Sequence, residues 1–191
     1  KRLRPAAGAA GPASHARMAG RVTAVVGLAL FLAATTIVFP GVQPQLAAVG
    51  NRLYLAFGQG NVISVVQSAD GGETFGPPSQ LLVPGKMSLG MRRGPRIAAT
   101  NSAVLVAAVA GAEGGGADGD VLLFRSTDRG RTWARSVAIN DVPGSAREGL
   151  HAMAASPSGL VVVAWLDLRE KGTRVYAAVS RDHGATWTPD T

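Results

Sequence analysis

The chain has 191 residues, of which 47% are hydrophobic and 16% charged, a balance that excludes a chain kept disordered by its composition. Its formal net charge of +7 would suit a nucleic-acid-binding protein, but five of the 19 basic residues and none of the 12 acidic ones lie before residue 22. The rest of the chain is therefore close to neutral, which argues against DNA or RNA as a partner. The chain has no cysteine, so disulfides play no part in it.

The basic leader, residues 1–21, runs into an uncharged apolar stretch at residues 22–39. A basic segment followed by an apolar one is typical of an export signal, and a stretch of this length is also just long enough for a helix to cross a bilayer. We therefore predict a hydrophobic helix that is a cleaved signal peptide or an N-terminal membrane anchor, with a buried core helix as the remaining alternative. Because basic residues stay on the cytoplasmic side, the protein is expected to be exported, and either secreted or anchored to the outer side of the cytoplasmic membrane.

Residues 45–191 predict three repeats of short strands, rich in small and β-branched residues and separated by Gly, Pro, Asn and Ser turns. The repeats are 45–83, 95–139 and 150–191, and the last one is incomplete because the chain stops shortly after Trp187. Runs such as L-V-V-V-A-W at 160–165 are apolar on both faces, which predicts strands sandwiched between neighbouring sheets. The expected strands are 46–49, 53–57, 62–67 and 80–83, then 96–100, 104–109, 121–126 and 135–139, then 151–155, 160–165 and 174–180.

One turn, with the pattern Ser-x-Asp-x-Gly-x-Thr-aromatic, recurs after the third strand of each repeat. The Asp accepts hydrogen bonds from backbone N–H groups just ahead of it, the Gly supplies a positive φ, and the aromatic residue packs the hairpin onto its neighbour. The pattern predicts a hairpin tip that satisfies its own polar groups. Its members are Ser68, Asp70, Gly72, Thr74 and Phe75, then Ser126, Asp128, Gly130, Thr132 and Trp133, then Ser180, Asp182, Gly184, Thr186 and Trp187.

These turns resemble the Asp-box, or BNR repeat, of the sialidase (neuraminidase) family and related β-propellers, over about residues 45–191. The resemblance implies an all-β propeller of four-stranded antiparallel blades, with six blades in the full protein and three in this chain. The chain is therefore expected to be the N-terminal part of a longer protein, with an oligomer of partial propellers as the alternative. In that family the box is structural and not catalytic.

Chemistry is expected at the end of the strands away from the boxes, where loops from three repeats meet. These loops combine arginines with carboxylic acids, which suits an anionic carbohydrate, since Arg binds carboxylates in a bidentate manner and paired acids can cleave a glycosidic bond. A glycine-rich loop at residues 110–120 is expected to be flexible. The predicted catalytic residues are Asp167 and Glu148, and the predicted substrate-binding residues are Arg96, Arg147, Arg169, Arg93 and His151.

The family resemblance implies an exo-α-sialidase that acts on terminal acidic sugars, with three arginines on the substrate carboxylate, an Asp acid/base and a Tyr/Glu nucleophilic pair. Arg96-Ile97 resembles the family's Arg-Ile-Pro, but Ala98 replaces the Pro. We expect no metal ion and no cofactor. The residues leave open whether the protein is an enzyme. The alternatives are a non-catalytic Asp-box propeller that binds glycan or protein at the cell surface, and a scaffold anchored through residues 22–39.

Overall fold

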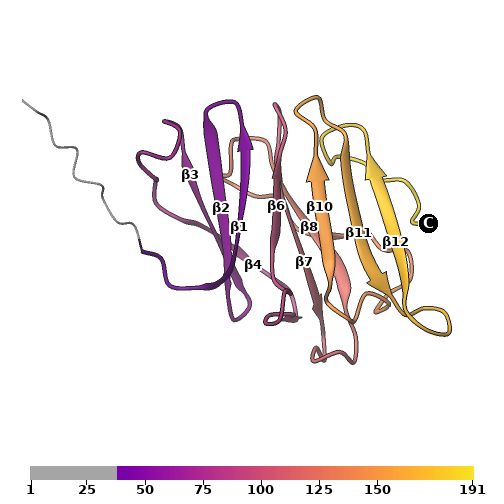
Figure 1. Ribbon diagram of the computed structural model, residues 1–191. Helices are drawn as coiled ribbons and strands as arrows, with labels where there is room; N and C mark the ends of the chain where they lie inside the picture. The colour runs from indigo at the N-terminus through magenta and orange to yellow at the C-terminus, as the bar shows by residue number, and fades with distance from the viewer. Residues whose placement is uncertain (1–37) are drawn as a thin grey trace, which may run out of the picture. The chain divides into compact units, whose positions relative to one another are not determined.

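The computed structural model describes residues 38–191, and every regular element in that range is a β-strand (Figure 1). The all-β prediction is therefore confirmed. The basic leader of residues 1–21 and nearly all of the predicted signal or anchor helix at 22–39 lie outside the described residues. Within residues 38–191, no helix is both long and apolar enough to cross a membrane.

The described strands form three antiparallel sheets that stand side by side, as expected for part of a β-propeller (Figure 1). The first sheet holds four strands in chain order and reproduces the predicted pattern of the first repeat. Its strands are β1 (Val42–Val49), β2 (Arg52–Gln59), β3 (Val62–Ser68) and β4 (Ser79–Leu82).

The second sheet has one strand more than predicted. Its members are β5 (Lys86–Met87), β6 (Arg96–Ala99), β7 (Val104–Gly111), β8 (Asp120–Ser126) and β9 (Val137–Ala138). Both β5 and β6 pair with β7, at its two ends, so a loop at residues 88–95 interrupts this edge of the sheet. The sequence predicted only a loop here. The short β5 forms because β6 pairs with only one end of β7. At the other end of β7, β5 provides hydrogen-bond partners for the backbone N–H and C=O groups.

The third sheet contains β10 (His151–Ala155), β11 (Val161–Asp167) and β12 (Arg174–Ser180). Residues after the third box run along the free edge of β12. The Thr188 N–H donates to the Val179 carbonyl at 2.9 Å, and Ala177 and Thr191 exchange hydrogen bonds of 2.9 and 3.1 Å. The last four residues therefore occupy the position of a fourth strand in this sheet.

Two hydrophobic cores lie between the sheets, and β7 contributes to both of them. Val104 and Val106 face the first sheet, whereas Leu105 and Val109 face the third, which explains why nearly all of β7 is buried. The sequence predicted that residues 160–165, most of which form β11, would also be buried on both faces between neighbouring sheets. There only alternate residues are buried, because within residues 38–191 no further sheet covers the outer face of β11.

The three boxes have the same hydrogen bonds. The Ser hydroxyl donates to the Asp carboxylate at 2.6, 2.7 and 2.7 Å, and the Thr N–H donates to it at 3.0, 2.9 and 2.9 Å. The hydroxyl hydrogen bonds of Ser68, Thr132 and Thr186 are the largest causes that hold the pKa values of the three aspartates well below their usual range. Each turn is therefore closed by its own side chains.

The second and third boxes dock onto the preceding sheet. Trp133 donates through Nε1 to the Ser79 hydroxyl at 3.1 Å, and that hydroxyl donates to the Gly130 carbonyl at 2.7 Å. In the third box, the His183 ring lies 2.9 Å from the Thr100 hydroxyl. The boxes thus join neighbouring sheets in addition to closing their own hairpins.

Gly184 offers a test of how tightly a box docks. Its φ is +78°, and a Cβ there would lie 2.0 Å from the Leu105 Cδ2 atom. We expect Gly184→Ala to lower the free energy of unfolding by about 2 kcal/mol, because it adds a buried clash to the strain of the left-handed backbone. Gly50→Ala is the matched control: Gly50 has a φ of +56° with no atom near the new Cβ, so strain alone should cost about 1 kcal/mol. If urea denaturation showed the same loss of unfolding free energy for both variants, the contact between Gly184 and Leu105 would be loose.

Candidate functional site

The boxes and the first hairpin turns lie at one end of the sheets, which we call the box end. The Gly71 N–H donates to the Asn51 carbonyl at 3.1 Å, and the His183 N–H donates to the Gly159 carbonyl at 3.0 Å. Since successive strands are antiparallel, the loops between the second and third strands and between sheets emerge at the other end, the loop end. These are the loops that carry the predicted site residues.

A pocket of about 420 Å³ opens at the loop end. Three separate segments form it: the loop before β6, the loop between β7 and β8, and the loop before β10. This loop-end pocket is lined by Met87, Ser88, Leu89, Arg93, Gly115, Gly116, Arg147 and Glu148. It brings together three of the seven predicted catalytic and binding residues, namely Arg93, Arg147 and Glu148.

Arg93 and Glu148 join two of these segments. The Arg93 Nε donates to the Glu148 carbonyl at 2.7 Å, and its Nη2 lies 3.9 Å from the Glu148 carboxylate. Gly149 permits this approach, because a Cβ there would lie 2.7 Å from Ser88 Cβ and 3.0 Å from Arg93 Cδ. Arg147 is exposed, and none of the ion pairs within residues 38–191 involves it. Its guanidinium is therefore available to a ligand.

Arg96 does not line the loop-end pocket. Its guanidinium donates to the carbonyls of Arg92, Gly94 and Pro95, in the loop that interrupts the sheet edge. Partial burial lowers the pKa of Arg96. In this arrangement Arg96 braces the loop that presents Arg93, so it acts on the pocket through its neighbour.

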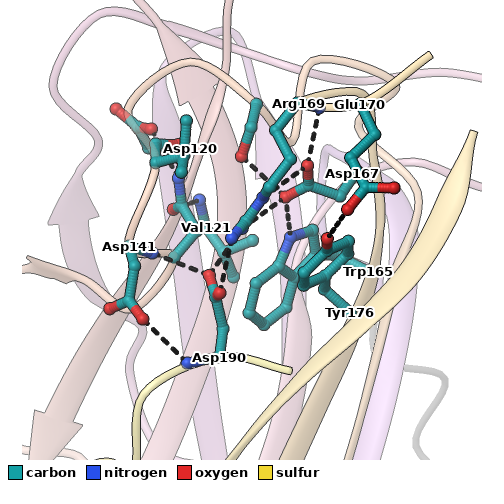
Figure 2. Close-up of polar contacts among 12 residues, drawn as sticks. Asp120, Val121, Asp141, Trp165, Asp167, Arg169, Glu170, Tyr176 and Asp190 are labelled. Atoms are coloured by element: carbon teal, nitrogen blue, oxygen red, sulfur yellow. Dashed lines mark hydrogen bonds and ion pairs between the residues drawn. The ribbon is translucent and has the colours of Figure 1, made fainter.

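Asp167 and Arg169 lie in a buried ionic network, shown in Figure 2. The Arg169 guanidinium donates to the Asp167 carboxylate at 2.7 and 2.9 Å, and Ser145 and Trp165 donate to the same carboxylate at 2.6 and 2.9 Å. Burial alone would raise the pKa of Asp167, but these hydrogen bonds outweigh it and hold that pKa well below its usual range. A carboxylate so fully engaged suits the positioning of a loop better than proton transfer.

The same guanidinium reaches the end of the chain. Arg169 makes two hydrogen bonds of 2.6 Å to Asp190, which exchanges backbone-to-carboxylate bonds of 2.7 and 2.9 Å with Asp141 (Figure 2). The Arg169 guanidinium also lies 4.0 Å from the centre of the Tyr176 ring, and the Tyr176 hydroxyl donates to Glu170 at 2.9 Å. The hydrogen bonds that Arg169 donates to Asp190 and Asp167 raise the pKa of Arg169. The network therefore ties residue 190 to the loop before β10 and the loop after β11.

His151 is buried in the core between the second and third sheets, apart from the loop-end pocket. Its Nε2 lies 3.2 Å from the Ala107 carbonyl, and its Nδ1 has no hydrogen-bond partner among residues 38–191. Burial lowers the pKa of His151 to about 4, and the charge of Arg96 adds to this effect. His151 is therefore neutral at pH 7 and donates to the carbonyl through Nε2.

Sequence reasoning missed the role of Gly115 and Gly116 in the pocket wall. The loop that holds them was predicted to be flexible, but the Asp118 carboxylate closes it by accepting hydrogen bonds from the N–H groups of Ala112, Glu113 and Gly114. These bonds, above all the one from Gly114, lower the pKa of Asp118. An Asp that follows a glycine run is a signal for such a closed turn. Among residues 38–191, no group of three or more His, Asp or Glu side chains is placed to hold a metal ion.

Comparison with known families identifies the repeat. A profile of the family described as a BNR repeat-like domain matches residues 37–191. The chain belongs to the BNR repeat-like domain family. This match confirms the predicted BNR repeat, and the three boxes of this BNR repeat-like protein lie within the matched residues. Among curated proteins, no sequence matches the chain.

Solved structures show the same fold. The GH93 α-L-arabinofuranosidase of Fusarium graminearum in complex with arabinobiose is 13% identical, with a TM-score of 0.53, over 78% of this chain and 47% of that one. The same enzyme with an iminosugar inhibitor is 13% identical, with a TM-score of 0.52, over 79% and 48%. A weaker similarity relates the chain to a mutant of NanB sialidase from Streptococcus pneumoniae, with 19% identity and a TM-score of 0.41 over 68% and 18%. The chain spans about half the length of the arabinofuranosidase, and at this identity the similarity shows the fold alone.

Proposed function

We propose that this BNR repeat-like protein acts on carbohydrates, as an exported glycoside hydrolase of the exo-α-sialidase type that takes terminal acidic sugars. The observation that carries the proposal is the loop-end pocket, in which Arg93, Arg147 and Glu148 meet. Its volume of about 420 Å³ is in the range of small-molecule sites and suits one sugar ring. Export, predicted from residues 1–39, is part of the same proposal because it would bring the pocket to extracellular glycans.

Each of the three charged residues that line the pocket has a proposed role. Arg147 binds the carboxylate of the sugar, since its guanidinium is exposed and has no ion-pair partner within residues 38–191. Arg93, fixed through its Nε by the Glu148 carbonyl, keeps its terminal nitrogens near the same ligand. Glu148 is the carboxylate that would exchange a proton with the glycosidic oxygen.

The test is release of a fluorophore from a 4-methylumbelliferyl sialoside by the intact protein, with the corresponding arabinofuranoside as a neutral comparison. We expect release from the sialoside, and we expect Arg147→Gln to lower kcat/KM by about ten- to a hundredfold, mainly through KM, because a charge-assisted bidentate contact is lost. Arg135→Gln, an equal change in charge away from the pocket, is the control. No release over a broad pH range, or equal rates for Arg147→Gln and the control, would overturn the proposal.

A specific observation also favours the second candidate, a non-catalytic propeller that binds glycan. Most glycosidases cleave the glycosidic bond with two carboxyl groups. Within residues 38–191, the loop-end pocket is lined by one, that of Glu148, and Asp167 pairs with Arg169 outside it. This candidate predicts no fluorophore release by the wild type or any variant. In a separate calorimetric titration, it predicts sialoside binding that Arg147→Gln weakens and Glu148→Gln leaves intact.

A further inference from the structure

A second pocket lies at the box end, in the groove between the first and second sheets, away from the loop-end pocket. Its volume is about 340 Å³. We call it the box-end pocket. Its lining includes Arg52 and Arg129, the Tyr54 ring, and the hydroxyl-bearing residues Thr100, Ser102 and Thr127.

The charge of the box-end pocket has one sign. Arg52 and Arg129 both line it, and no Asp or Glu side chain of the described residues 38–191 does. None of the ion pairs within residues 38–191 involves either arginine. Two guanidinium groups in one cavity repel each other unless an anion lies between them. The pocket therefore carries an uncompensated positive charge.

Tyr54 supplies a further donor. Its side chain is 2% exposed, and its ring packs beside the second box, 4.0 Å from a Cβ placed at Gly130. Burial raises the pKa of Tyr54, while the charges of Arg52 and Arg129 oppose that rise. All three residues line the same pocket. The phenol stays protonated, so its O–H can donate to an anion held by the two arginines.

The corresponding position between the second and third sheets is closed. There, His183 occupies the box position that Arg129 occupies in the second box, and its ring lies 2.9 Å from the Thr100 hydroxyl. The same ring lies against Gly159, where an added Cβ would be 2.7 Å away. Both residues have a positive φ, 68° for Arg129 and 59° for His183. The backbone is thus left-handed at the same box position in both junctions, and the side chain there decides whether the space is filled or lined with charge.

We propose that the box-end pocket binds a small ligand through a tetrahedral oxyanion ester, the sulfate or phosphate group of a sugar. The two guanidinium groups and the phenol surround the anion, as charge-assisted donors do. The hydroxyl groups of Ser102 and Thr127 contact the rest of the ligand, whereas the Thr100 hydroxyl donates to the Ala103 carbonyl. This site is separate from the loop-end pocket and does not depend on the proposed hydrolase activity.

The experiment is isothermal titration calorimetry of the intact protein with glucose 6-phosphate and glucose 6-sulfate, with glucose as the uncharged comparison. All titrations use an Arg147→Gln background, so that an anion in the loop-end pocket does not contribute. We expect both esters to bind, and the phosphate more tightly because it carries more negative charge. Arg52→Gln and Arg129→Gly should each weaken binding by about tenfold or more, and Tyr54→Phe by about threefold.

Two of these variants are expected to leave the fold unchanged. Arg129→Gly relieves a left-handed backbone that Gly adopts without strain, and Tyr54→Phe keeps the buried ring. Arg131→Gln removes the same charge from the same box outside the pocket, and it should change binding less than twofold. The proposal is overturned if neither ester binds, or if Arg52→Gln and Arg129→Gly bind as the Arg131→Gln control does.

Discussion

Replacement of Arg169 by Met is expected to lower the free energy of unfolding by about 3–5 kcal/mol, the largest effect that we predict for one side chain. Arg169 is the counter-ion of two buried carboxylates, since the side chain of Asp167 is 0% exposed and that of Asp190 is 1% exposed. Without the guanidinium, both carboxylates stay buried and charged, or they must take up protons at a cost. The loss should be seen as a lower midpoint in urea denaturation.

Arg174→Gln is the matched control, because it removes an arginine from the same region. Arg174 pairs with Glu170 at 3.5 Å, but their side chains are 62% and 55% exposed. An exposed pair of this kind contributes less than about 0.5 kcal/mol. If Arg169→Met lost less than about 1 kcal/mol, or no more than the control, water would have to reach both carboxylates in the folded protein, and the network would not hold residue 190 in place.

The second large effect is a loss of stability in mild acid that depends on His151. Burial lowers the pKa of His151 to about 4, whereas a histidine in an unfolded chain titrates near 6.5. The unfolded state therefore binds the proton first as the pH falls below about 6.5. Stability should decline by about 3 kcal/mol between that pH and pH 4, and level off below it for this group.

The measurement is the free energy of unfolding at several pH values for the wild type and two variants. His151→Gln should abolish most of the decline between pH 6.5 and 4, because an amide does not titrate. His183→Gln keeps His151 and should retain the decline. The carboxylates with lowered pKa values, such as Asp167, lose their contribution only as the pH falls below about 4, so they act in a separate window. A wild-type profile that is flat between pH 6.5 and 4 would show that the buried ring is solvated.

Much of the fold could be predicted because its signals are local. The three boxes place Ser, Asp, Gly and Thr within a few residues of one another, so the hydrogen bonds that close each hairpin depend on neighbours in sequence. The strands follow for the same reason, since alternation and turn residues are short-range patterns. The short β5 was not predicted because two residues are too few to show an alternation of apolar and polar side chains. They form a strand only because the end of β7 has no other pairing partner on that side.

The sequence could predict which loops form the candidate site, but not which arginine pairs with which carboxylate there. The antiparallel order of the strands sends the charged loops to one end, and three predicted residues, Arg93, Arg147 and Glu148, meet in one pocket there. The sequence could not show that Asp167 is engaged by Arg169. Which arginine meets which acid depends on burial and on backbone contacts between segments far apart in the chain.

The sequence by itself determined the repeat, the box turns and the direction in which the loops emerge, because each of these depends on residues close together in the chain. Only the tertiary structure decided which charges are free to bind a ligand. Asp190 meets Arg169 across 21 residues, Glu148 meets Arg93 across 55, and Arg52 shares a pocket with Arg129. Pairing along the edge of the third sheet brings Asp190 to Arg169, and packing between sheets brings the other two pairs together. The same packing sets their exposure to water. That exposure separates Arg147, free at the surface of its pocket, from Arg169, which is held inside the fold.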